Sequence, residues 1–188
     1  MKIDYTIEDE KIKICNFEWA KDPGEFLKLY DDRLTDISFL HLKGAIRCKT
    51  NSSFSAANGS GVIVSIHVIP HNSRFEFESF NNISVSFTPE LQSVQLIMTD
   101  VPFRYCYENP GTINRLDIYI PTERIRDLIP AALLERLTRY KIVNVTHQPA
   151  GGTMEVDALL NKLIKELEKP KSKSLLRCLE QFLTSVTH

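Results

Sequence analysis

The segment from Asn114 to Pro130 constrains the fold most, because the pattern of the chain changes there. Residues 114–120 alternate polar and apolar side chains, as a half-buried strand does. Pro121 follows at once, and residues 122–129 have the composition of a short helix, in which proline is favoured at the first position. Alternating strands and turns precede this segment, and we expect helices from there to the end of the chain. That order predicts an α+β fold, a β-barrel, sandwich or jelly roll with C-terminal helices.

Turn signals recur about every ten residues in the first 120 residues, which is typical of a barrel or sandwich. The expected elements are a hairpin of residues 2–7 and 11–17, helical spacing at residues 26–30, strand character over 38–49, a loop over 51–61 and a strand buried on both faces over 62–69.

Residues 62–120 are expected to supply the core of the barrel, because their apolar side chains alternate along successive short strands. A turn at residues 81–82 joins two of these strands into a hairpin with one wet face. The side chains predicted to be buried are Val64, Ile66, Phe75, Phe77, Val85, Phe87, Leu96, Tyr105 and Ile118.

The last third of the chain shows helical periodicity. A helix over residues 131–140 and a loop over 146–152 lead to a longer helix capped by Thr153 and broken by Pro170, and a further helix follows Ser172. The apolar stripe of the longer helix predicts either a homodimer interface or a surface covered by the last helix; its members are Leu159, Leu160, Leu163, Ile164 and Leu167. We therefore expect a β-barrel domain over residues 1–120 and a helical region for packing and dimerisation over 121–188.

Charge and composition exclude several classes of protein. A net charge of -1 gives no basic field with which the chain could hold nucleic acid. No apolar run approaches membrane-spanning length and the first residues do not form an export signal, so a cytoplasmic protein is expected. The four cysteines are scattered without a C-x-x-C pair, which favours reduced thiols.

The sequence offers little catalytic chemistry. His67 and His71 with Glu76 and Glu78 loosely resemble the ligand set of a cupin metal site, but the histidines are four residues apart with a proline between them. A histidine packed in a strand is the simpler interpretation of His67, and no metal or cofactor is expected. Nucleophile elbows, phosphate loops and dinucleotide fingerprints do not occur in the sequence.

Three arginines lie on predicted strands beside apolar positions. Arg47, Arg104 and Arg115 could each bind a carboxylate of a ligand, or could pair with a carboxylate of the chain at Glu76, Glu78 or Asp117. Pairing within the chain is the favoured interpretation.

The order of elements resembles a known family. Residues 61–66, the alternating hairpin, Phe103 to Tyr105, a glycine-bearing turn, residues 115–121 and residues 125–128 together resemble the N-terminal regulatory domain of AraC/XylS-type bacterial transcription regulators. The resemblance covers about residues 38–187 and is strongest for the PchR-like branch, which senses siderophores. It implies a cupin-like barrel that binds a small-molecule effector, for instance a siderophore, and helices that form a homodimer.

The resemblance also implies how the protein works. In such regulators, two helix-turn-helix motifs that bind DNA follow the helices. The sequence ends where that region is expected, so we expect DNA contact only through a C-terminal domain that is missing here. An effector inside the barrel would shift the packing of the helices, and the ligand-binding side chains expected there are His67, Met98, Arg104 and Tyr105. The alternatives are a small cupin-class enzyme, either a metal-dependent oxygenase or an isomerase, and a structural adaptor that uses only its helices.

Overall fold

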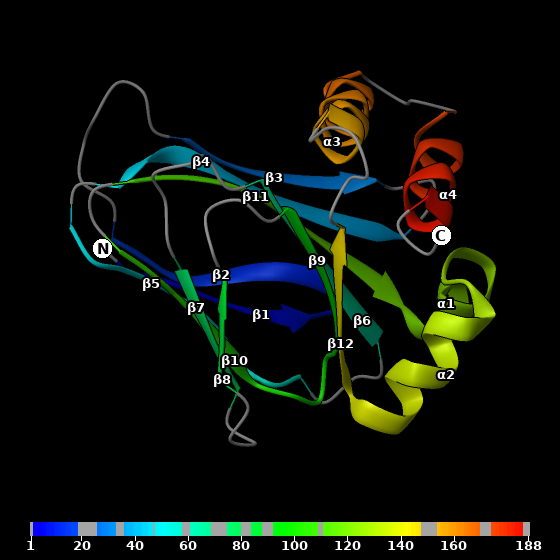
Figure 1. Cartoon of the computed structure of the whole chain (residues 1–188), viewed down its shortest axis with the longest axis horizontal. Helices are drawn as coiled ribbons and strands as arrows, with labels where there is room; N and C mark the ends of the chain where they lie inside the picture. The colour runs from blue at the N-terminus through cyan, green and yellow to red at the C-terminus, as the bar shows by residue number, and fades with distance from the viewer. Residues whose placement is uncertain are drawn as a thin grey trace.

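Two six-stranded sheets face each other, and helices pack on the outer side of one of them (Figure 1). The computed structural model describes residues 2–18, 26–32, 36–46, 48–57, 61–68, 75–79, 84–87, 92–108, 111–147, 154–169 and 174–185. The strands are β1 (Lys2–Glu8), β2 (Lys11–Glu18), β3 (Phe26–Asp32), β4 (Ile37–Ile46), β5 (Thr50–Phe54), β6 (Gly61–His67), β7 (Phe75–Ser79), β8 (Ser84–Phe87), β9 (Gln92–Met98), β10 (Phe103–Tyr107), β11 (Gly111–Pro121) and β12 (Ile142–His147). The helices are α1 (Thr122–Leu128), α2 (Ala131–Tyr140), α3 (Met154–Leu167) and α4 (Leu175–Ser185).

The strand order places non-consecutive strands side by side, as in a jelly roll. Sheet A has the order β2-β1-β5-β10-β7-β8, and sheet B has the order β12-β9-β6-β11-β4-β3. Neighbouring strands are antiparallel except β1 and β5, which run parallel. At one side of the sandwich the two sheets meet, where the Ile12 amide of β2 donates to Ser38 Oγ of β4 at 2.8 Å. The predicted fold class, a barrel or jelly roll followed by helices, is confirmed.

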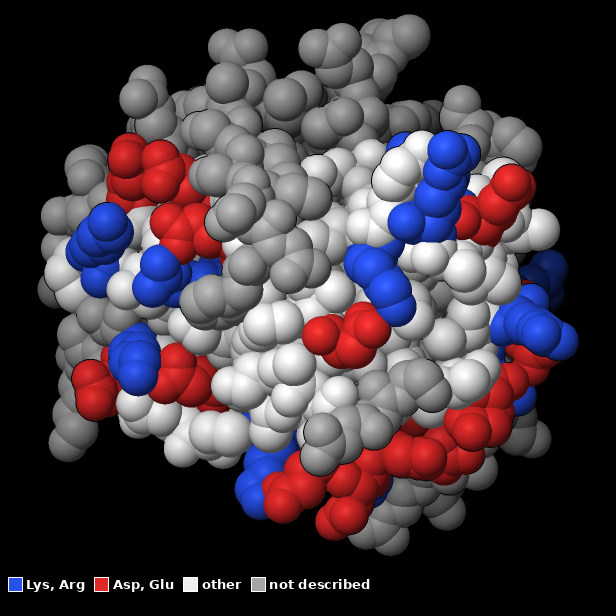
Figure 2. Space-filling model, turned by 90° about the horizontal axis from the view of Figure 1, so that it is seen from below, with Lys and Arg blue, Asp and Glu red and all other residues white. Residues whose placement is uncertain are grey.

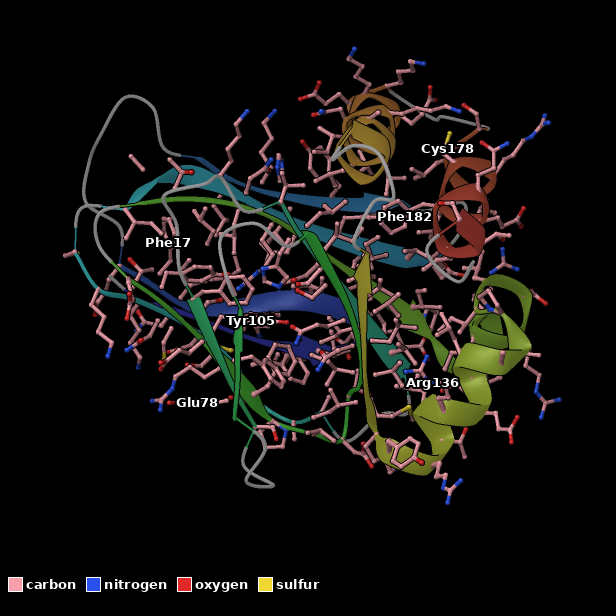
Figure 3. All side chains as sticks on the ribbon, in the orientation of Figure 1. Phe17, Glu78, Tyr105, Arg136, Cys178 and Phe182 are labelled. Carbon is pink, nitrogen blue, oxygen red and sulfur yellow. The ribbon has the colours of Figure 1, made fainter. Side chains whose placement is uncertain are left out.

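The two faces of sheet B explain how its central strands are buried. Every residue of β6 is buried, because one face lies against sheet A and the other against the helices. Two hydrophobic clusters result, one between the sheets and one between sheet B and the helices. Figure 3 shows Tyr105 between the sheets and Phe182 on α4, in the helical layer.

Most of the predicted core is confirmed. Val64, Ile66, Leu96 and Ile118 are buried in the cluster that faces the helices, and Phe75, Phe77 and Tyr105 in the cluster between the sheets. Val85 and Phe87 lie on β8, opposite Phe77 and Phe75, but their side chains are outside what the structure describes.

Two predictions in the first third of the chain were wrong. Residues 26–32, which have helical spacing, form the edge strand β3, whose backbone pairs with β4 over its whole length. Residues 50–54, most of which were expected in a loop, form β5 between β1 and β10. In both cases pairing with neighbouring strands outweighs local preference. The predicted first hairpin is confirmed as β1 and β2.

The prediction of helices from residue 121 to the end was also wrong in one place. Helix α2 ends at Lys141, which has the left-handed conformation with φ 64°, and the chain returns to sheet B as β12 beside β9. The four helices themselves are confirmed. None of the helices in the described ranges is long and apolar enough to cross a membrane.

A close backbone approach fixes the start of β6. A Cβ atom at Gly61 would lie 2.5 Å from Cε2 of Tyr119 and 3.0 Å from the carbonyl oxygen of Ile120. These residues belong to β11, the neighbour of β6. Only glycine therefore lets the two central strands meet here.

Candidate functional site

The inner face of sheet B is polar at its centre, although it lies inside the sandwich. The side chains concerned are buried with at most 2% exposure and come from three adjacent strands: Ser93 and Gln95 on β9, Ser65 and His67 on β6, and Arg115 and Asp117 on β11. Strand register aligns them in two rows across the sheet, Ser93–His67–Arg115 and Gln95–Ser65–Asp117. We call these six residues the polar interior.

An ion pair lies at the centre of the polar interior. Arg115 Nη2 is 3.1 Å from Asp117 Oδ2, and both side chains are fully buried. The carboxylate also accepts hydrogen bonds from Tyr5 OH at 2.8 Å and from Ser65 Oγ at 2.5 Å. Burial of a charge without partners is very unfavourable, and these contacts offset that cost.

Sheet A supplies the remaining partners of the arginine. Arg115 Nη1 donates to Tyr107 OH at 2.7 Å, and Nη2 donates to Ser52 Oγ at 2.6 Å. The guanidinium carbon also lies 4.8 Å from the ring centroid of Tyr105, within cation–π range. Within the described part of the chain, Arg115 Nε has no hydrogen-bond partner. Burial by itself lowers the pKa of the guanidinium, but the negative charge of Asp117, together with the neighbouring tyrosines, raises this pKa above its usual value.

His67 is held among aromatic rings. Its imidazole stacks on Phe75 with 4.5 Å between centroids and meets Tyr105 at 4.6 Å, and its Nε2 is 3.1 Å from Ser65 Oγ. Burial, and secondarily the positive charge of Arg115, lowers the pKa of His67 well below its usual value. The imidazole is therefore neutral at pH 7.

The buried tyrosines are neutral as well. Burial raises the pKa of Tyr5 and of Tyr105 well above the usual value, and the nearby charge of Asp117 raises both further. Burial likewise raises the pKa of Tyr107, although the Arg115 charge opposes this. The three hydroxyls thus act as hydrogen-bonding groups and not as anions.

A chain of hydrogen bonds leads from the polar interior to β12. Tyr105 OH donates to Gln95 Oε1 at 2.5 Å, and Gln95 Nε2 donates to Asn144 Oδ1 at 2.7 Å. Since β12 lies between α2 and α3 in the chain, this path connects the interior with the helical layer.

The structure brings together two of the four predicted ligand-binding residues. Tyr105 and His67 are in ring contact inside the sandwich. Met98 is half-buried near the end of β9 and packs against both hydrophobic clusters. Arg104 lies on the outer face of sheet A, where its Nε donates to Glu78 Oε2 at 2.9 Å, and Figure 3 shows Glu78 on that outer side.

The expected pairing of arginines within the chain is confirmed for two of the three. Arg104 pairs with Glu78 and Arg115 with Asp117, while Arg47 lies outside the described residues. Of the two arginines in this set that the structure describes, Arg115 is thus the one that faces the interior. The alternation of residues 114–120 could have located it, because Arg115 and Asp117 share a face of β11 and differ in charge.

Of the residues weighed for a metal site, those that the structure describes do not meet. His67 faces the interior from sheet B, whereas Glu76 is exposed on sheet A and Glu78 lies on the outer face of sheet A. His71 is outside the described residues. In the part of the chain that the structure describes, no three histidine, cysteine or acidic side chains gather closely enough to hold a metal ion.

The apolar stripe of α3 mostly packs within the chain itself. Leu160 and Leu163 are fully buried, with Leu179 and Phe182 of α4 in the same cluster. Ile164 and Leu167 are partly buried beside them, and the side chain of Leu159 is not described. Glu166 joins the two helices by accepting a hydrogen bond from Ser174 Oγ at 2.5 Å.

A separate surface hollow of about 540 Å³ lies where α1 and α2 meet α4. Its lining carries both signs of charge, with Arg126, Asp127 and Glu180 around Ile129 and Pro130. None of its lining residues belongs to the polar interior.

Comparisons with known proteins bear on the fold. No family model matches the sequence, and no curated protein matches it either. Among solved structures, the chain is similar to the AraC-like transcriptional activator CuxR, with a TM-score of 0.56, 11% identity and coverage of 86% of this chain and 54% of CuxR. It is also similar to ToxT from Vibrio cholerae O395 bound to (E)-4-(8-methylnaphthalen-1-yl)but-3-enoic acid, with a TM-score of 0.51, 13% identity and coverage of 79% and 56%. The chain therefore has the fold of part of these AraC-like regulators and spans about half of their length.

Proposed function

We propose that this chain is the effector-sensing and dimerisation domain of an AraC-type transcription regulator, and that its effector binds in the polar interior. The observation that carries the proposal is the buried polar centre of sheet B, which a purely structural sandwich does not need. Replacing a buried ion pair by apolar side chains is often neutral or stabilising, so its presence favours a binding role. The similarity of fold to CuxR and ToxT supports the same assignment.

The proposed effector is a small organic molecule. ToxT was solved with an organic acid bound, which shows that a protein of similar fold accommodates such a ligand. The side chains of the polar interior are packed together, so binding requires a conformation in which they separate. The narrower assignment, a siderophore sensor of the PchR-like branch, rests on the resemblance in sequence pattern.

The proposed output is a shift of the helices. Gln95 links Tyr105 to Asn144 of β12, and an effector that disturbs Tyr105 would move β12 and the helices on either side of it. Two copies of the domain would associate through the partly buried side of α3. DNA would be contacted by a separate C-terminal domain, in keeping with the face shown in Figure 2, on which both basic and acidic side chains are present.

The test has two arms. Thermal unfolding of the purified chain is measured against siderophores, fatty acids, sugars and small aromatics, and saturable stabilisation by one class is expected. The matched part of CuxR is then replaced by this chain, and the hit compound should change the expression of a reporter under a CuxR-dependent promoter. Saturable stabilisation by none of the compounds would refute the sensor assignment. A metal-dependent enzyme would instead co-purify with a stoichiometric metal ion.

A further inference from the structure

The charges in the polar interior cancel. Of the residues that the structure describes, Arg115 and Asp117 are the ionised side chains buried between the two sheets, and they pair with each other at 3.1 Å. The His67 imidazole and the nearby tyrosine hydroxyls are uncharged, as their environment requires. The interior therefore has a formal charge of zero at neutral pH.

This balance has a consequence for what can bind. An ionised ligand would lose its hydration on entering, and each buried charge that could pair with it is already paired within the chain. A carboxylate that approached Arg115 would also lie close to Asp117 and be repelled by it. An uncharged ligand meets neither obstacle.

The interior also offers unused hydrogen-bonding atoms. Arg115 Nε and Ser93 Oγ are buried and have no hydrogen-bond partner among the residues that the structure describes. They belong to the same row of residues, on either side of His67. An unsatisfied buried polar atom is costly, so a ligand that bonds to these two atoms gains more than the same group would gain in water.

Aromatic rings pack against the same residues. Phe75, Tyr105 and His67 are in mutual ring contact, and Tyr107 lies 5.5 Å from Phe75 between centroids. Rings of this kind bind the apolar faces of sugars and the faces of aromatic molecules. The polar atoms at the rim of these rings would set the orientation of the ligand.

We propose that the effector, whose site rests on the function proposed above, is an uncharged small molecule with an aromatic or otherwise apolar face that hydrogen-bonds to Arg115 and Ser93. The domain discriminates against the ionised analogue of the same ligand. This sets it apart from ToxT, whose ligand in the solved structure is a carboxylic acid.

Matched pairs of probes test the proposal, because the members of each pair share a scaffold and differ in charge. Binding of benzamide and benzoate, 1-naphthaleneacetamide and 1-naphthaleneacetate, and glucose and glucuronate to the 188-residue chain is measured at pH 7.5 by calorimetry and ligand-detected NMR. At least one neutral member should bind at least tenfold more tightly than its charged partner. Tighter binding of the charged members would overturn the charge inference while leaving the sensor function standing. Binding of none of the six at millimolar concentration would overturn the charge inference, whereas the sensor function is decided separately by the thermal-unfolding panel described above.

Two variants connect the binding with the residues. Ser93→Ala removes the unpaired hydroxyl and should lower the affinity for the neutral probe at least tenfold. Ser53→Ala is the matched control, because Ser53 lies beside Arg104 on the outer face of sheet A, and it should leave the affinity unchanged. Equal affinities of the two variants would refute the assignment of Ser93.

The third variant tests the charge balance itself. Asp117→Asn leaves the Arg115 charge without its partner and should raise the affinity for the carboxylate member of the preferred pair at least tenfold. Circular dichroism at 10 °C verifies that the variant is folded. If it is unfolded, the proposal is tested by the comparison of Ser93→Ala with Ser53→Ala and by the relative affinities of the neutral and charged probes. A folded variant that still rejects carboxylates would overturn the proposal.

Discussion

Gln95 Nε2 on β9 donates a hydrogen bond to Asn144 Oδ1 on the neighbouring strand β12, at 2.7 Å. The same glutamine accepts a hydrogen bond from Tyr105, so this member of the polar interior joins sheet A to the strand that connects α2 with α3. We therefore expect Asn144→Ala to separate binding from its effect on the helices. The variant should lose about 1 kcal/mol of unfolding free energy, the usual value of one hydrogen bond.

Hydrogen exchange measures this separation. In the parent chain, a bound effector should change the exchange rates of α3 amides, and in Asn144→Ala that change should disappear while the affinity stays within threefold. Arg177→Ala, at an exposed position on α4, is the control and should behave like the parent. An unchanged response of α3 in Asn144→Ala would exclude this path.

Phe77 is expected to be the most sensitive core position between the sheets. It is fully buried and in ring contact with both Phe103 and Tyr105. Phe77→Ala should reduce the free energy of unfolding by about 3–5 kcal/mol through the cavity that it leaves. Glu76→Ala, at the neighbouring exposed position, should change it by no more than about 0.5 kcal/mol. Urea unfolding measures both, and an unchanged midpoint for Phe77→Ala would contradict the placement.

The buried ion pair should show strong coupling. Arg115→Met and Asp117→Asn each leave one buried charge without its partner and should each cost about 3–5 kcal/mol. The double variant removes both charges together and should cost clearly less than the sum of the two. Chemical denaturation of the four proteins closes this cycle. Simple additivity would mean that water, and not the partner, stabilises each charge.

Stability should fall in mild acid. The folded-state pKa of His67 is lowered by burial, so below about pH 6.5 the unfolded chain binds a proton that the folded chain does not. The free energy of unfolding therefore decreases as the pH falls below this value, by up to about 1.4 kcal/mol per pH unit for one proton. Burial also lowers the pKa of His41, which adds to the slope. His67→Leu should make the profile between pH 6.5 and pH 5 shallower, and a slope equal to that of the parent would argue that His67 is solvated.

The dimer that we propose can be tested on the helix α3. Leu163 is fully buried in the chain, so Leu163→Glu should unfold the protein, whereas Leu167→Glu affects a partly buried side chain and should give a folded monomer. Lys165→Glu is the exposed control and should leave the association unchanged. Light scattering distinguishes these outcomes. A parent chain that is monomeric at high concentration would remove the dimer proposal.

Sequence reasoning located those parts of the fold in which burial and periodicity agree. The alternation along β7, β10 and β11 identified buried residues, and the apolar stripes identified α3 and α4. It failed for β5, because a strand of Thr-Asn-Ser-Ser-Phe has the composition of a loop. The burial of Ser52 on this strand is accounted for by its hydrogen bond with Arg115, a residue 63 positions later in the chain. A contact over that separation leaves no local signal.

The candidate site was recognised only in part for the same reason. Tyr105 and His67 were predicted because aromatic and soft side chains stood on apolar strands, and the structure brings them into contact. The sequence does not show which of Arg104 and Arg115 faces the interior. A shift of one residue in the predicted strand would turn each side chain to the opposite face of its sheet. Gln95 and Ser93 were not identified, because uncharged polar residues alternating on a strand are equally typical of a solvated face.

The two-faced arrangement of sheet B bears on which changes in length the chain can tolerate. On β6, β9 and β11, successive residues face opposite layers, so one inserted or deleted residue would turn the polar row toward the helices and the aliphatic row toward the tyrosines. The packing on both faces of sheet B would be disrupted, and Gly61 would no longer lie where β11 comes closest. The edge strands β2 and β3 each have one neighbour in their sheets, and a length change there would disturb a single pairing. Natural variation in length should therefore accumulate at these edges and be absent from the three central strands.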